Sequence, residues 1–305
     1  MGFILLDYST LLTKISKYEK IKKETTNNSG KKIKKNKFNI KVIGTTYYGR
    51  SIFAVKQVKK TKLPTAILVA SIHARENITT DLLCKMIDEN LFDGITKFNI
   101  SFILMANPDG VELSKNGLKN YPKSSWNYLL QLNENNSDFS LWKSNARGVD
   151  LNNNFDAKFG TNSHSNCFSS HGFSGLFAES EEETKAIVAY TKKVKPFITI
   201  SYHSKGEEIY FNFFQTNSDL KRDEIIAKRF AESTGYAIKN VENSSSGGYK
   251  DYCVSKLNIP ALTIEVGSDN LSHPISEKYL DEIYEKNKNI VEDLNFALSC
   301  MTAKK

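Results

Sequence analysis

Three short segments of the chain carry residues that can bind and use a metal ion. They are His73-Ala-Arg-Glu76, His203 within Ser-Tyr-His-Ser, and Glu265 within Leu-Thr-Ile-Glu-Val-Gly. Two histidines and one carboxylate form the protein ligand set of many catalytic zinc sites, which keep a fourth position open for water. A further carboxylate that does not bind the metal takes a proton from that water. Together the four side chains predict a zinc-dependent hydrolase.

The residues around His73 and Glu76 predict a turn between a strand and a helix. Residues 65–70 form a short apolar run, which is typical of a buried parallel strand. From Asn77 onwards the apolar residues have helical spacing. His73 and Glu76 are therefore expected at the carboxyl edge of a sheet, where open α/β sheets bind their ligands.

His203 and Glu265 occupy similar positions. His203 follows the apolar run 196–202, and Glu265 ends the apolar run 261–265. The chain as a whole predicts strands that alternate with helices, which indicates an α/β fold with helices on both faces of the sheet. Strands are expected near 38–43, 52–58, 65–70, 100–105, 197–203, 208–214 and 261–265, and helices near 78–91, 180–193, 220–235 and 276–298.

Further motifs follow one another along the chain: Gly49-Arg50, Asn107-Pro-Asp-Gly110, Gly148-Val-Asp-Leu-Asn152, Ser180-Glu181, Gly247-Gly248 and Ile264-Glu-Val-Gly267. With the metal-site segments, they resemble the zinc metallocarboxypeptidases of peptidase family M14, in that family's order, from about Phe38 to Gly267. The resemblance implies a three-layer α/β/α fold with a mixed, mainly parallel eight-stranded sheet.

The resemblance also implies roles for single residues. His73, Glu76 and His203 would be the ligands of one zinc ion per chain. Glu265 would be the general base that activates water and then protonates the leaving amine. Asp150 would orient the ring of His73 without binding the metal itself, which fixes the tautomer of that histidine and raises its basicity.

The chain departs from the carboxypeptidase pattern at Asn152-Asn153, where the family carries Asn-Arg. That arginine grips the terminal carboxylate of the substrate with two ionic hydrogen bonds. Asn153 is neutral and short, so the bidentate clamp is lost. Asn152 and Asn153 are still expected to contact substrate, but a terminal carboxylate should bind poorly, which favours internal cleavage.

A second departure is Lys143, which stands where the family has the arginine that stabilises the oxyanion. A lysine supplies positive charge without a planar fork. We expect Lys143 to take this role, with Arg147 or Arg75 as substitutes and a solvated lysine as the alternative.

A third departure lies in the segment 244–252, expected as a loop. The mobile tyrosine of digestive relatives is missing from its usual place, and Tyr249 is the candidate replacement. Lys250 occupies a position that lines the specificity pocket in relatives, where an ammonium group would pair with an acidic substrate group. An exposed loop charge is the alternative for Lys250.

These departures resemble one branch of the family, the γ-D-glutamyl-L-diamino acid endopeptidases. Those enzymes cut peptidoglycan stem peptides between γ-D-glutamate and meso-diaminopimelate or lysine, and Lys250 would neutralise the second carboxylate of diaminopimelate. The expected partner is a peptide or muropeptide. Two alternatives stay open: a metallocarboxypeptidase that removes C-terminal residues and a non-catalytic wall-binding relative. Amidohydrolases of the aspartoacylase type use the same ligand trio, but Asn107-Pro-Asp-Gly110 and the residues around Glu265 favour a peptidase.

Because the resemblance begins near Phe38, residues 1–37 are expected as a basic helix-and-loop extension and residues 38–305 as the zinc peptidase domain. Residues 1–62 hold 16 Lys and Arg but three acids. An amphipathic helix is expected over 4–24, followed by a loop whose lysines 31–37 either contact an anionic wall polymer or are simply solvated. The run lacks interleaved aromatic residues, which argues against nucleic-acid binding.

Targeting signals are weak. No apolar stretch approaches the roughly 20 residues of a membrane span, and the N-terminus does not resemble a secretion signal. The four cysteines have no paired short spacing, which favours a reducing compartment. We therefore expect a cytoplasmic monomer, with release to the cell wall or spore as the alternative.

Overall fold

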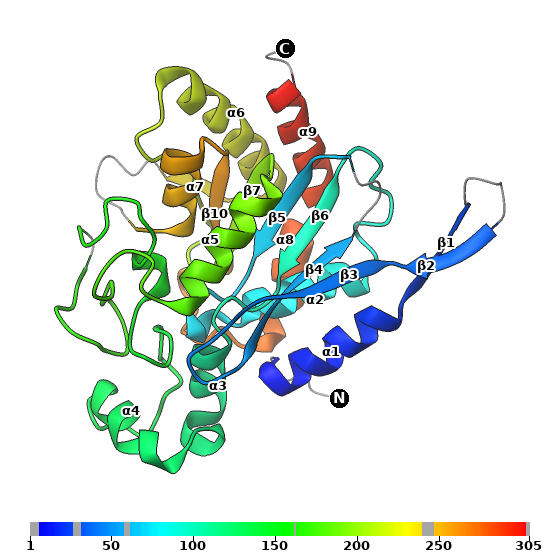
Figure 1. Ribbon diagram of the computed structural model, residues 1–305. Helices are drawn as coiled ribbons and strands as arrows, with labels where there is room; N and C mark the ends of the chain where they lie inside the picture. Colours follow the sequence, from blue (N-terminus) through cyan, green and yellow to red (C-terminus); the bar gives the residue numbers. More distant parts are fainter. Residues whose placement is uncertain (1–5, 27–31, 58–61, 162, 240–246, 303–305) are drawn as a thin grey trace.

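The computed structural model describes residues 6–26, 32–57, 62–161, 163–239 and 247–302. The strands are β1 (Lys22–Thr26), β2 (Lys32–Asn36), β3 (Phe38–Thr45), β4 (Ser51–Gln57), β5 (Thr65–Val69), β6 (Asn99–Ile103), β7 (Ile198–His203), β8 (Glu208–Tyr210), β9 (Ala237–Lys239) and β10 (Ala261–Glu265). The α-helices are α1 (Tyr8–Lys20), α2 (Ile78–Asp88), α3 (Pro108–Asn116), α4 (Trp126–Leu132), α5 (Glu182–Val194), α6 (Asn217–Thr234), α7 (Tyr249–Leu257), α8 (Leu280–Asn287) and α9 (Ile290–Thr302). Figure 1 shows their arrangement.

Eight strands form one mixed sheet in the order β3-β4-β6-β5-β7-β10-β8-β9. The central pairs β6–β5, β5–β7 and β7–β10 are parallel, whereas β3–β4, β4–β6 and β10–β8 are antiparallel. Every residue of β5, β6 and β7 is buried, as expected for strands covered on both faces. Neighbouring strands β5, β7 and β10 therefore bring their carboxyl ends together, and the predicted eight-stranded α/β sheet is confirmed.

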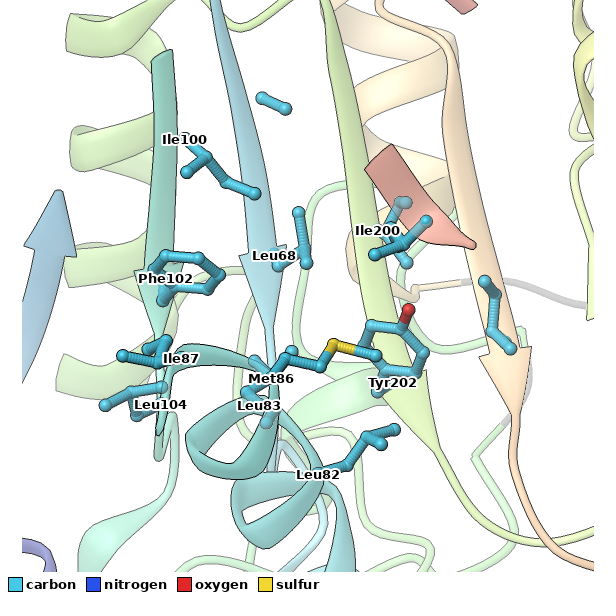
Figure 2. Close-up of a cluster of buried hydrophobic side chains, with 14 of the residues drawn as sticks. Leu68, Leu82, Leu83, Met86, Ile87, Ile100, Phe102, Leu104, Ile200 and Tyr202 are labelled. Carbon is cyan, nitrogen blue, oxygen red and sulfur yellow. The ribbon is translucent and has the colours of Figure 1, made fainter. Parts of the chain in front are cut away.

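Helices cover both faces of the sheet, because successive strand residues point to opposite sides. In β5, Ala66 and Leu68 belong to the core shared with α1, α2, α6, α8 and α9, while Ile67 and Val69 belong to the core shared with α5 and α7. Figure 2 shows the first of these cores, with Met86 of α2 beside Tyr202 of β7. The two packed cores confirm the three-layer arrangement and hold the site-bearing strands rigidly.

The structure differs from the expectation in the basic extension. The helix expected over 4–24 forms at Tyr8–Lys20, where the Asp7 side chain accepts the amide hydrogen of Thr10 as an N-cap. The expected loop after it contains the antiparallel hairpin β1–β2, with Glu24 opposite Lys34. Backbone pairing stabilises this ribbon, and its polar sequence gives no apolar alternation from which a strand is predicted.

Three other expected elements have different bounds. The strand expected over 208–214 ends at Tyr210, and the helix expected over 276–298 is divided into α8 and α9 near Lys288. The segment expected as a loop continues as helix α7 from Tyr249 onwards. Across the ranges that the structure describes, no helix is both long and apolar enough to cross a bilayer.

Candidate metal centre and active site

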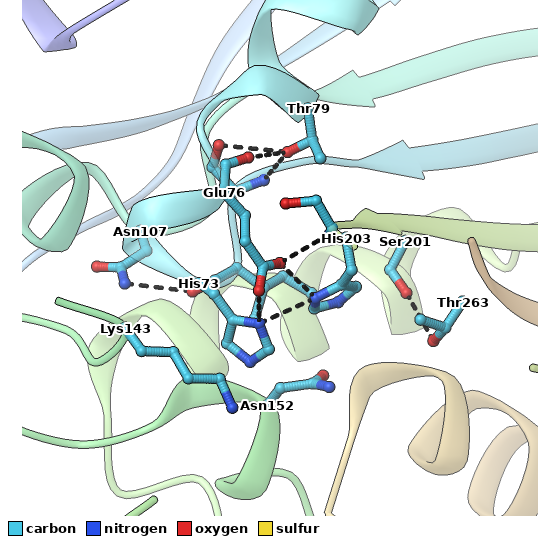
Figure 3. Close-up of polar contacts among 12 residues, drawn as sticks. His73, Glu76, Thr79, Asn107, Lys143, Asn152, Ser201, His203 and Thr263 are labelled. Carbon is cyan, nitrogen blue, oxygen red and sulfur yellow. Dashed lines mark hydrogen bonds and ion pairs between the residues drawn. The ribbon is translucent and has the colours of Figure 1, made fainter. Parts of the chain in front are cut away.

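His73 and Glu76 lie in a turn that is tied to the start of α2. After β5 the chain turns at Ser71, which has a φ of +50°, and Ala74–Glu76 form a short 3₁₀ helix. The Ser71 amide donates to Thr79 Oγ1 at 2.9 Å, and Thr79 Oγ1 donates to the Glu76 carbonyl at 2.8 Å. These bonds fix the direction in which both side chains leave the turn, as Figure 3 shows.

His203 and Glu265 end two adjacent parallel strands. Their Cα atoms are register partners at the last positions of β7 and β10. The Val266 amide donates to the His203 carbonyl at 2.8 Å, which continues the pairing just past the strand end. Hydrogen bonding within the sheet therefore places His203 and Glu265 side by side.

The side chains of His73, Glu76 and His203 converge as metal ligands do. His73 Nδ1 lies 3.1 Å from His203 Nδ1, and these nitrogens lie 2.8 and 3.0 Å from the two Glu76 oxygens. Two nitrogens bound to a tetrahedral zinc at about 2.05 Å would be roughly 3.3 Å apart. All three ligand atoms lie within 4.8 Å of one another, so this buried donor set fits a zinc ion.

Electrostatics favour a cation at the same point. Burial alone would raise the pKa of Glu76, but the imidazoles of His73 and His203 hold that pKa well below its usual range. Glu76 is thus a carboxylate. Its charge and the convergent imidazole nitrogens supply the ligands that zinc prefers.

Asp150 lies behind His73. Its Oδ1 is 3.3 Å from His73 Nε2, and its Oδ2 is 2.8 Å from Lys143 Nζ. Against the effect of burial, Lys143 and His73 hold the pKa of Asp150 well below its usual range. A carboxylate on the outer nitrogen leaves Nδ1 of His73 as the ligand atom.

A cavity of about 340 Å³ opens beside these residues. Its lining includes His73, Arg75, Glu76, Lys143, Ser204, Lys205, Tyr210, Glu265, Asp269 and His273. Burial, reinforced by Glu76, raises the pKa of Glu265 to about 8 in the ion-free protein, although His203 opposes the rise. The cavity therefore joins a metal-binding group, a second carboxylate and a lysine in one space.

Comparison with known proteins identifies the family of this chain. Residues 31–290 match the zinc carboxypeptidase family. The chain belongs to that family. This is a family of zinc metallopeptidases, which agrees with the metal-binding group formed by His73, Glu76 and His203.

Three relatives show the range of this zinc carboxypeptidase family. The chain is 30% identical over 233 residues to gamma-D-glutamyl-L-diamino acid endopeptidase 1 of Lysinibacillus sphaericus, covering 71% of this chain and 57% of that protein. It is 31% identical over 197 residues to human carboxypeptidase A1, covering 60% of this chain and 43% of that protein. It thus spans about half the length of these two relatives. Bovine thrombin-activatable fibrinolysis inhibitor, solved in complex with tick carboxypeptidase inhibitor, shares the fold with a TM-score of 0.71 at 16% identity, covering 97% and 98% of the chains.

Asn152 and Asn153 lie on the short 3₁₀ turn that follows Asp150, and neither is among the residues that line the cavity. Asn152 Oδ1 accepts the amide hydrogen of Tyr249 at 3.2 Å. Gly247 packs against the turn with a φ of +84°, and a Cβ atom there would lie 2.8 Å from the Asn153 carbonyl oxygen. Only a glycine therefore fits this approach without strain.

Two residues predicted to contact substrate are placed elsewhere. Tyr249 is fully buried in helix α7, and its hydroxyl lies 2.7 Å from Thr191 Oγ1, so it cannot cover a substrate as a mobile tyrosine does. Lys250 is also buried; its Nζ donates to the Asn212 carbonyl at 2.9 Å and forms an ion pair with Asp251. Both predictions assumed a loop, and the helix turns these side chains into the protein.

Arg147 is not among the residues that line the cavity. Its Nε lies 3.7 Å from a Glu181 oxygen, and its guanidinium stacks on the Tyr47 ring at 5.3 Å. Lys143, by contrast, lines the cavity, as does Arg75, the other proposed substitute.

Four residues of the lining were not singled out from the sequence: Lys205, Tyr210, Asp269 and His273. Lys205, Asp269 and His273 lie in irregular segments after β7 and β10, and Tyr210 is the last residue of the short strand β8. Proximity in sequence to His203 and Glu265 was the one signal that would have found them. His273 Nδ1 is buried and has no hydrogen-bond partner among the described residues.

Proposed function

We propose that this chain is a zinc-dependent peptidase that hydrolyses the bond between γ-D-glutamate and a diamino acid in peptidoglycan stem peptides. The observation that carries the proposal is the neutral Asn153, on the turn that follows Asp150, the residue in contact with His73. Carboxypeptidases of the family carry an arginine there to bind a terminal carboxylate. The similarity to an endopeptidase of that specificity supports the same substrate class.

His73, Glu76 and His203 would hold the zinc ion. When bound, zinc supplies the Lewis acidity that polarises the scissile carbonyl and activates water at neutral pH. Asp150 orients the His73 ring through Nε2, at 3.3 Å. In this assignment three buried side chains bind the metal, and Asp150 orients one of them.

Glu265 would transfer the proton, and Lys143 would stabilise the negative charge that develops on the carbonyl oxygen. The Glu265 carboxylate takes the proton of the attacking water and delivers it to the leaving amine nitrogen. The Lys143 ammonium, held by Asp150 at the cavity, donates a hydrogen bond to the developing oxyanion. A lysine suits this role because its flexible stem follows the oxygen as the carbonyl carbon becomes tetrahedral.

Arg75 replaces Lys250 as the cation for an acidic substrate group. Lys250 is already neutralised by Asp251, whereas Arg75 lines the cavity and its Nη1 has a long contact of 3.4 Å with the Leu141 carbonyl. We assign the second carboxylate of diaminopimelate to Arg75, since a guanidinium binds carboxylates in a two-pronged manner.

Removal of C-terminal residues is the second candidate function. It is favoured by the 31% identity to human carboxypeptidase A1 and by Arg75 and Lys143, two cations in the cavity that can attract a terminal carboxylate. A non-catalytic role is disfavoured, because the ligand residues and Glu265 are all present at one site.

Zinc-loaded protein tested on L-Ala-γ-D-Glu-meso-diaminopimelate and on a hippuryl dipeptide separates these functions. Release of free diaminopimelate, lost in the Glu265→Gln variant and after chelation, is the expected result. Turnover of the hippuryl substrate alone would replace the endopeptidase with a carboxypeptidase. Turnover of neither substrate by zinc-loaded protein would contradict both.

A further inference from the structure

A larger cavity, of about 610 Å³, lies at the opposite end of the sheet from the metal centre. Thr65 and Asn99, the first residues of the parallel strands β5 and β6, line it. The metal ligands instead follow the carboxyl ends of β5 and β7. Strands β3 and β4 and the last two turns of α5 complete its walls. The proposed peptidase activity makes no use of this cavity.

Positive charge dominates the cavity. Lys41, Lys56 and Lys193 line it from three different elements, β3, β4 and α5, and the described lining residues include no carboxylate. Lys56 Nζ donates to Thr65 Oγ1 at 3.1 Å, and within the described chain none of these lysines forms an ion pair. Burial and the neighbouring Lys41 lower the pKa of Lys56. The described residues thus supply no counter-ion for the lysine charges.

Apolar side chains share the same walls. Ile43, Leu63 and Val194 line the cavity, and Val42 beside them is 55% exposed. A small inorganic anion would leave these side chains in contact with water. A ligand with both an anionic group and an apolar portion satisfies the lysines and the apolar wall together.

We propose that this cavity binds an organic phosphate. Lysine is a common phosphate ligand that acts as a point charge, and a phosphate dianion brings more negative charge than a carboxylate to a volume lined by three lysines. No arginine is among the described residues of the lining. Three lysines from separate elements line one volume, and hydrogen bonds from charged donors to phosphate oxygens are about twice as strong as neutral ones.

The phosphate has two possible sources, a free small molecule or the repeating unit of an anionic polymer. Hairpin β1–β2 leads directly into β3 and exposes Lys32, Lys34 and Lys35. Asn39, which lines the cavity, follows the end of the hairpin by three residues. A polymer occupying the cavity would therefore pass along the hairpin lysines, while a small molecule would not.

Calorimetric titration of the full chain with phenyl phosphate tests the site. Lys193→Gln and Lys56→Gln are each expected to weaken binding about 10- to 100-fold, the effect of losing one hydrogen bond to a charged group. Lys185→Gln, an exposed lysine on the same helix that pairs with Glu182 at 2.7 Å, is the matched control and should bind like the parent protein. Benzoate is expected to bind at least about tenfold more weakly than phenyl phosphate.

Absence of saturable phenyl phosphate binding would overturn the proposal, and so would an equal loss in Lys185→Gln or a preference for benzoate. Lys193 is exposed, so its replacement is expected to change binding without lowering the stability of the fold. A glycerol-phosphate oligomer then identifies the source. If Lys34→Gln weakens the oligomer but not phenyl phosphate, the site binds a polymer; if it weakens neither, the site binds a small molecule.

Discussion

Glu183 offers a quantitative test of the electrostatics around the site. Its carboxyl group is buried, and Oε2 accepts a hydrogen bond from Asn145 at 3.3 Å. Asn145 in turn accepts the amide hydrogen of Val149, next to Asp150. Burial, reinforced by Asp109 and Glu181, raises the pKa of Glu183 from 4.5 to about 8. Ionisation of this side chain therefore opposes folding.

The raised pKa of Glu183 makes the free energy of unfolding depend on pH. Because the pKa is higher in the folded than in the unfolded protein, the stabilising contribution is complete below about pH 4.5 and is lost as the pH rises through about 8. The loss is on the order of 5 kcal/mol above pH 8 and roughly 3 kcal/mol near neutrality. That is a large part of a typical unfolding free energy of about 5–15 kcal/mol.

Glu183→Gln removes the charge and keeps the shape. Oε1 of Glu183 has no partner among the described residues, so an amide group can replace it without breaking a bond there. Urea unfolding is expected to show the variant a few kcal/mol more stable than the parent at about pH 8.5, with a small difference at about pH 5. The exposed neighbour Glu182→Gln is the control and should shift stability by less than about 0.5 kcal/mol at either pH. A stability difference that does not change with pH would refute the reasoning.

Three further predictions concern the site itself. Asp150→Asn should weaken zinc binding about 10- to 100-fold in a chelator competition; an unchanged affinity would mean that the contact to His73 is not a working one. Gly247→Ala should lower the free energy of unfolding by more than about 1 kcal/mol in urea, because its φ is +84° and the new Cβ would lie 2.8 Å from the Asn153 carbonyl oxygen. Gly248→Ala, at negative φ, should lower it by less. Asn153→Arg should raise turnover of a hippuryl dipeptide at least about tenfold by restoring a bidentate clamp; no gain would argue that position 153 does not contact a terminal carboxylate.

The strand ends that carry the site could be predicted because buried parallel strands leave a strong signal. The apolar runs before His73 and His203 correspond to β5 and β7, whose residues are all buried. The run that ends at Glu265 corresponds to β10. Since sheet geometry then brings parallel strand ends together, the location of the candidate site followed from the sequence.

Polar and irregular segments carried no comparable signal. The hairpin β1–β2 is held by backbone bonds, so its lysine-rich sequence did not indicate strands. The sequence around Tyr249 and Lys250 predicts a loop that faces substrate, but these residues begin helix α7, where the Gly248 amide donates to Asp251 Oδ2 at 3.3 Å as a cap. His273 reaches the cavity through an irregular segment, and its position depends on tertiary packing alone.

The wide separation of the metal ligands in the chain affects how the protein folds. His73 and His203 are 130 residues apart, yet their ring nitrogens face each other. Closing a loop of that length costs conformational entropy before any contact compensates for it, and such non-local pairing slows folding. Metal affinity should therefore appear late in refolding, after β5, β7 and β10 have paired. A chain cut within α5 should recover zinc binding only when its two fragments reassociate through the central strands.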